Sequence, residues 1–142
     1  MFKNRFYLIA LAFVTVNLAG CMMLARRPDQ SEFGFGPRAS TTGAFVATLE
    51  PETPFVKKKL QRARLVVRDK NGELVRAAQV TLDGGMPQHG HGLPTRPRVT
   101  RNLGDGIYDI DGVRFNMGGW WEFKVAIAGK AGNDTVTFNF AL

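Results

Sequence analysis

The chain has 142 residues and a formal net charge of +7, with 19 Lys and Arg against 12 Asp and Glu. Once an N-terminal leader is removed, this length holds one domain of ordinary size and leaves no room for a second. The basic residues are spread along the chain, whereas nucleic-acid binders concentrate them on one element, so we expect no nucleic-acid partner. The single cysteine, Cys21, excludes an intramolecular disulfide and a thiolate metal cluster.

The N-terminal segment has the pattern of a secretory signal peptide. Lys3 and Arg5 precede an apolar run from Phe6 to Val16, and small residues follow. Residues 18–21, Leu-Ala-Gly-Cys, resemble the lipobox of bacterial lipoproteins, in which the cysteine is acylated and becomes the new N-terminus. At about 0.8 kcal/mol per buried methylene, several acyl chains form an effectively permanent anchor. The alternative is an uncleaved transmembrane helix, because roughly 20 apolar residues span a bilayer.

The lipobox resemblance implies a palmitate-carrying lipoprotein that is anchored to a membrane and faces the periplasm or the cell exterior. Residue 22 is Met, not Asp, which by the sorting rules of such lipoproteins favours the outer membrane where a cell has two. We therefore predict a signal peptide with a signal/anchor helix over residues 1–20, a lipidated Cys21 with a flexible tether over 21–40, and one domain over 41–142. Phe33 and Phe35 are the tether residues that could dock on the domain.

The domain is predicted to be all-β, because short β-rich runs alternate with turn signals from Thr41 onward. This pattern is typical of an immunoglobulin-like antiparallel β-sandwich of about seven to eight strands. The expected strands cover residues 44–49, 60–68, 74–82, 99–103, 106–110, 113–116, 120–128 and 134–142. Asn71-Gly72 predicts a hairpin turn, and residues 83–97 form a Gly- and Pro-rich loop. In the last strand, Val136, Phe138 and Phe140 are expected to face the core.

Three stretches of this region carry a family resemblance. Residues 86–92 read Met-Pro-Gln-His-Gly-His-Gly, 106–108 read Gly-Ile-Tyr, and 113–122 read Val-Arg-Phe-Asn-Met-Gly-Gly-Trp-Trp-Glu. Together they resemble the YtkA-like domain and its FixH-like relatives, over roughly residues 60 to 142. The resemblance implies an immunoglobulin-like sandwich in an exported or membrane-attached protein, and a role in copper handling or oxidase assembly.

The same stretches contain residues that suit a metal ion. His89 and His91 are both of the chain's histidines, and in an extended segment Cβ atoms two residues apart point to one side. Met86 lies three residues before His89, and Met117 lies on a segment expected to be a neighbour. Among biological metals, thioether and imidazole together best suit Cu(I), with Cu(II) or Zn(II) as alternatives at the histidines.

Two tryptophans extend this hypothesis. An indole face of Trp120 or Trp121 could cover a bound monovalent cation. In a strand the two side chains point to opposite faces, so one is expected in the core. Each feature also has a structural interpretation, in which the histidines bond loop carbonyls or water and the methionines fill the core.

Catalysis is poorly supported, because Cys21 is committed to the anchor and no serine lies in a recognisable nucleophile elbow. We therefore expect no enzyme. Two functions remain open: a copper-binding domain in metal handling or oxidase assembly, and a metal-free structural or protein-interaction module at the cell envelope. Lys57, Lys58 and Lys59 are expected to form a solvated turn, with contact to lipid or a protein partner as the alternative.

Overall fold

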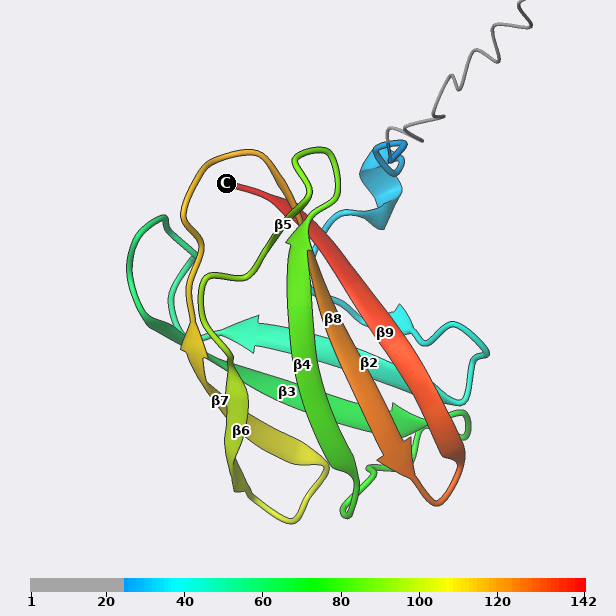
Figure 1. Ribbon diagram of the computed structural model, residues 1–142. Helices are drawn as coiled ribbons and strands as arrows, with labels where there is room; N and C mark the ends of the chain where they lie inside the picture. The colour runs from blue at the N-terminus through cyan, green and yellow to red at the C-terminus, as the bar shows by residue number, and fades with distance from the viewer. Residues whose placement is uncertain (1–24) are drawn as a thin grey trace, which may run out of the picture.

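The computed structural model describes residues 25–142 (Figure 1). The predicted signal peptide, its helix and Cys21 lie outside these residues. In chain order the elements are η1 (Gln30–Glu32), β1 (Arg38–Ala39), β2 (Phe45–Pro51), β3 (Gln61–Asp69), β4 (Gln79–Met86), β5 (His91–Gly92), β6 (Arg98–Asn102), β7 (Ile107–Val113), β8 (Trp120–Gly129) and β9 (Gly132–Ala141). Within residues 25–142, no helix has the length and apolar character needed to cross a membrane.

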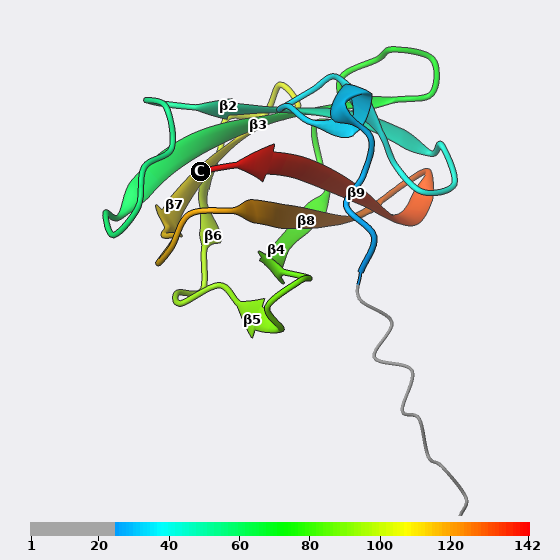
Figure 2. The ribbon, with the colours of Figure 1, turned by 90° about the horizontal axis from the view of Figure 1, so that it is seen from above.

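The strands form two antiparallel sheets that face each other. One sheet has the order β1-β2-β3-β7-β6 and the other has the order β5-β4-β8-β9. Seen from above in Figure 2, β2 and β3 lie in one layer and β4, β8 and β9 in the other. The predicted all-β sandwich is therefore confirmed, with two additional strands, β1 and β5, of two residues each. The separate strand predicted at 113–116 is wrong, because β7 itself continues to Val113 and Phe115 forms only an isolated bridge with Lys57.

The core between the sheets follows the period-two pattern of the sequence. In β9, Val136, Phe138 and Phe140 are buried as predicted, with exposed fractions of 0%, 0% and 5%. Inward-facing residues of β2, β3, β7 and β8 complete this core. In each strand the alternate apolar residues lie on one face of the sheet. The two sheets pack with these apolar faces against each other, so each sheet buries the apolar face of the other.

The turn at Asn71-Gly72 forms, but the hairpin predicted around it is wrong. Gly72 has a φ of 84°, and its N–H donates to the carbonyl of Asp69 at 3.0 Å. Beyond the turn, a single bridge joins Arg68 to Leu74, and the next strand begins only at Gln79, in the other sheet. The chain crosses between the layers here, and Tyr108 supports the crossing by donating its hydroxyl to the carbonyl of Val75 at 2.8 Å.

Strand β4 lies further along the chain than predicted, at Gln79–Met86 and not at 74–82, and Gly84 and Gly85 continue it instead of starting a loop. A Cβ atom on Gly84 would collide with the carbonyl of Glu122, and one on Gly85 with the carbonyl of His91. These glycines therefore permit close approach of the neighbouring strands. The extended strand brings Met86 into the sheet, at the base of the Gly-rich segment.

The segment expected to be a tether is docked on the sandwich over much of its length. Phe35 packs its ring 5.5 Å from that of Phe55 and 5.1 Å from that of Phe140. Its carbonyl accepts a hydrogen bond from the N–H of Leu49 at 2.6 Å. Strand β1 then pairs with β2. The folded unit thus begins before residue 41.

Asp134 attaches the turn before β2 to the start of β9. One carboxylate oxygen accepts hydrogen bonds from the Thr42 hydroxyl at 2.6 Å and the Thr42 N–H at 2.9 Å. The other accepts from the N–H of Thr135 at 2.8 Å. The Thr42 hydroxyl is the main cause that holds the pKa of Asp134 well below its usual range, and the Ser40 side chain and these backbone N–H groups add to it.

We expect Asp134→Asn to reduce the acid sensitivity of folding. A carboxylate whose pKa is depressed in the folded state stabilises the protein above its unfolded pKa of about 3.9, and this stabilisation is lost as pH falls toward the folded pKa. Urea midpoints measured from pH 6 down to pH 2 should therefore fall less steeply in the variant. Asp105→Asn, which removes the same charge from an exposed turn, is the control. Equal slopes in Asp134→Asn and the wild type would contradict this assignment.

Candidate metal-binding site

The two histidines lie at the tip of the β4–β5 hairpin and are both exposed. Their rings are nearly parallel, with an interplanar angle of 9° and centroids 6.3 Å apart. The carbonyl of Met86 accepts hydrogen bonds from the N–H groups of His89 at 3.0 Å and Gly90 at 2.9 Å. Gly90 has a φ of 65°, a conformation that glycine adopts without strain. The turn therefore holds two exposed imidazoles on one hairpin with their rings nearly parallel.

Met86 lies beside this pair but faces the core. Its Cα is the antiparallel partner of His91, and directly opposed residues in an antiparallel ladder place their side chains on the same face. Met86 is only 1% exposed, and its methyl carbon lies 2.8 Å from the position that a Cβ atom on Gly119 would occupy. The thioether is thus covered from solvent, and its methyl end lies toward the β7–β8 connection.

Met117 lies on the β7–β8 connection and is 41% exposed. Its carbonyl accepts a hydrogen bond from Nε1 of Trp121 at 3.0 Å. Two residues later is Gly119, which the Met86 methyl approaches. The connection that carries Met117 therefore meets the β4–β5 hairpin where Gly119 approaches the Met86 methyl.

Both tryptophans are buried, and their indoles are engaged within the fold. Trp121 is 1% exposed, and its ring lies edge-on against Phe115 at 5.1 Å. Trp120 points to the other face, as expected for neighbours in a strand, and its Nε1 donates to Oδ1 of Asn139 at 2.9 Å. These contacts do not place either indole next to His89 or His91, so the covering of a bound cation by an indole remains a prediction.

The donor set limits the chemistry of the hairpin. Residues 25–142 contain no group of three or more His, Cys, Asp or Glu that could hold an ion. Divalent zinc in structural sites usually takes four such ligands, whereas soft monovalent copper accepts fewer and neutral ones, including thioethers. Among residues 25–142, the structure brings the two imidazoles near each other, but it does not gather them with the sulfurs of Met86 and Met117 into one ligand set.

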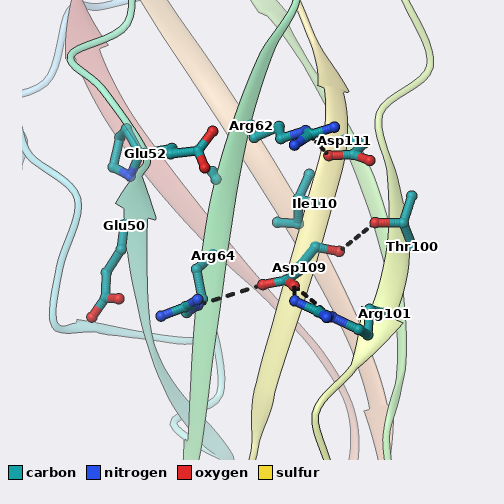
Figure 3. Close-up of a pocket in the computed structure, with 11 residues that line it drawn as sticks. Glu50, Glu52, Arg62, Arg64, Thr100, Arg101, Asp109, Ile110 and Asp111 are labelled. Carbon is teal, nitrogen blue, oxygen red and sulfur yellow. Dashed lines mark hydrogen bonds and ion pairs between the residues drawn. The ribbon is translucent and has the colours of Figure 1, made fainter.

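A charged cleft on the outer face of the five-stranded sheet was not predicted (Figure 3). It has a volume of about 580 Å³. Arg101 approaches Asp109 to 2.7 Å, Arg64 approaches the same carboxylate to 3.4 Å, and Arg62 approaches Asp111 to 2.9 Å. The Arg101 side chain is the main cause that lowers the pKa of Asp109. The signal in the sequence is the period-two spacing of Arg62 with Arg64 and of Asp109 with Asp111, but which charges pair depends on the order of the strands in the sheet.

These arginines and aspartates form ion pairs with one another. The cleft is therefore better explained as a solvated face of the sheet than as a ligand site. Exposed ion pairs of this kind contribute little to stability, typically about 0–1 kcal/mol each. They do keep the sheet face polar, which opposes association through it. The β4–β5 hairpin therefore remains the candidate site.

Comparisons with known proteins bear on the family of this chain. The ZirS C-terminal domain is a similar solved structure, with a TM-score of 0.39 and 10% identity, covering 100% of this chain and 95% of that one. A similarity of this size carries no argument about function. No curated protein matches the chain at a significant level. The family model described as YtkA-like matches residues 39–126. These residues contain β2 through β7, the histidine hairpin and most of β8, and the chain therefore belongs to the YtkA-like family.

Proposed function

We propose that this YtkA-like protein is an envelope lipoprotein whose sandwich binds one Cu(I) ion at the β4–β5 hairpin. The observation that carries the proposal is the exposed, nearly parallel pair of imidazoles of His89 and His91, with ring centroids 6.3 Å apart. With metal–nitrogen bonds of about 2 Å, two imidazoles on one ion place their centroids roughly 5 to 6 Å apart. Small rotations of exposed side chains would bring both rings to one ion.

The methionines are assigned a supporting part in this site. Met86 is opposite His91 in the ladder, and methionine is flexible enough to change rotamer within a packed environment. Because Met86 is buried, its sulfur would reach the ion only after such a change. Met117 is already partly exposed, so it is the ligand proposed from outside the hairpin. Copper handling or assisting the assembly of an oxidase is the role proposed for such a site.

The lipid anchor at Cys21 is part of the same proposal. Its support is the Leu-Ala-Gly-Cys motif at the end of an apolar run. Phe33, which forms a bridge with Asn139 of β9, is twelve residues from Cys21, so the two can be separated by at most about 40 Å. A sandwich attached in this way would remain near the membrane, where a membrane-bound partner could exchange metal with the hairpin.

A titration with Ag(I), the redox-stable mimic of Cu(I), tests the metal site. We expect one ion per chain, with tryptophan emission changing on binding because Trp121 bonds the Met117 carbonyl. His89→Ala and His91→Ala should each weaken binding at least about tenfold, since changes in outer-shell residues alone cost 10–100-fold. Met86→Leu and Met117→Leu should have smaller effects. Affinity should also fall on acidification, because a protonated imidazole cannot ligate a metal.

Gln88→Ala, a substitution in the same exposed turn, is the matched control and should leave the affinity unchanged. If the affinity is the same in all four ligand variants and the wild type, the site is rejected, whatever the protein binds elsewhere. In that case the metal-free interaction module becomes the better explanation.

A further inference from the structure

The β2–β3 connection carries a basic and apolar protrusion, the basic loop, formed by residues 56–60 with the sequence Val-Lys-Lys-Lys-Leu. Leu60 is 68% exposed and Val56 is 44% exposed. Among residues 25–142, Leu60 is the most exposed large hydrophobic side chain. In Figure 1 the connection projects beyond the end of the sandwich where β2 ends and β3 begins.

The basic loop is anchored from beneath. Phe55, the residue just before it, is 7% exposed and packs against the rings of Phe35, Phe115 and Phe140 at 5.5, 5.1 and 5.7 Å. An aromatic cluster thus holds the base of the loop, while the five residues after Phe55 are all exposed. The exposure of Leu60 is therefore a property of an ordered connection.

Hydrogen bonds define the shape of the loop. The Gln61 side chain accepts from the N–H of Val56 at 2.7 Å and donates to the Val56 carbonyl at 2.9 Å and the Lys59 carbonyl at 3.3 Å. The N–H of Lys58 donates to the carbonyl of Phe115 at 2.7 Å. Lys58 has a φ of 64°, a left-handed conformation that is uncommon outside glycine. The fold holds this residue in place and presents the three lysines at the surface.

The surroundings leave the loop positively charged. Asp111 lines the neighbouring cleft with Glu52, and Asp111 is already paired with Arg62 at 2.9 Å. Glu52 is the other carboxylate of that lining, so its single negative charge does not balance the three lysines of the loop. A negatively charged partner is therefore favoured.

We propose that the basic loop docks on an anionic lipid surface, with the lysines at the headgroups and Leu60 inserted among the acyl chains. Lysines near an anionic leaflet attract it additively, and an apolar residue beside them gains by burial at the interface. A protein partner would need a broad complementary surface of about 800 Å² on each side. One leucine on a narrow protrusion does not offer that, whereas a fluid membrane accepts it. This proposal depends on neither metal binding nor acylation of Cys21.

Flotation of the protein with vesicles tests the proposal. The chain from residue 22 onward retains every core contact described here, so it serves for the assay. It should bind vesicles of equal parts phosphatidylglycerol and phosphatidylcholine, but not vesicles of phosphatidylcholine alone. Changing Lys57, Lys58 and Lys59 together to Gln should reduce partitioning about 100-fold, from roughly fivefold per lysine. Leu60→Ser should reduce it about tenfold, as expected for a leucine that loses most of its burial.

Lys70→Gln with Lys130→Gln is the matched control. These lysines are exposed in the turn after β3 and the turn between β8 and β9, and partitioning should be nearly unchanged because charges beyond about 10 Å from the surface are screened. Circular dichroism confirms that each variant is folded. Equal loss in control and loop variants, equal binding to both vesicle types, no binding to either, or unchanged binding of Leu60→Ser would each overturn the proposal.

Discussion

Phe138→Ala is expected to destabilise the protein by about 3–5 kcal/mol, the usual cost of truncating a large buried aromatic side chain. Phe138 is 0% exposed, and its partner in the ladder is Phe123 of β8, which is also 0% exposed. Phe138 belongs to β9 in the four-stranded sheet, and its ring faces the other sheet. Its removal therefore leaves a cavity between the two sheets, and the strands cannot readily close this cavity. Against a total stability of about 5–15 kcal/mol, this is a large fraction.

Denaturant unfolding of the metal-free protein measures the effect. His89→Ala is the matched comparison, because His89 lies in an exposed turn where substitutions usually change stability by less than about 0.5 kcal/mol. A loss for His89→Ala as large as that for Phe138→Ala would show that the imidazole is a structural group. The metal-site proposal would then lose its main support.

Cys21→Ser is expected to abolish lipid attachment completely. A serine hydroxyl does not replace the thiol that the lipobox resemblance requires, and removal of the acyl chains takes away about 0.8 kcal/mol of membrane affinity for each buried methylene. Cells grown with labelled palmitate should incorporate label into the wild-type protein and none into the variant. The variant should also retain its N-terminal segment, because acylation precedes cleavage in such lipoproteins.

Met23→Ser keeps residues 18–21 intact and should be labelled like the wild type. Equal labelling of Cys21→Ser and the wild type would end the lipoprotein proposal and favour an uncleaved transmembrane helix. The vesicle experiment on the basic loop would keep its meaning in either case, since it uses protein without Cys21.

The positions of the strands were largely predictable because their apolar residues recur with a period of two. This holds best for β9, where Val136, Phe138 and Phe140 are buried as predicted. It fails around Gly84 and Gly85, because a glycine that ends a strand and a glycine that allows two strands to approach closely look alike in a sequence. The difference lies in the carbonyl groups of Glu122 and His91, which belong to neighbouring strands.

The hairpin predicted at Asn71-Gly72 shows a second limit. The local turn chemistry was predicted correctly, since Gly72 adopts a positive φ. A turn does not determine which sheet the next strand joins, however. That choice depends on burial of the two faces by the whole chain, and the bond from Tyr108 to the carbonyl of Val75 that supports the crossing connects residues 33 positions apart.

The sequence by itself determined the all-β class, the family resemblance and the residue types of the candidate site, because periodicity, turn residues and ligand chemistry are local properties. Only the tertiary structure decided that Met86 is covered while His89 and His91 are exposed, that the Arg and Asp side chains of the outer sheet face pair with one another, and that the basic loop is anchored through Phe55 and Gln61. Exposure, pairing and anchoring all depend on contacts between residues far apart in the chain, and these contacts exist only after the two sheets have packed together.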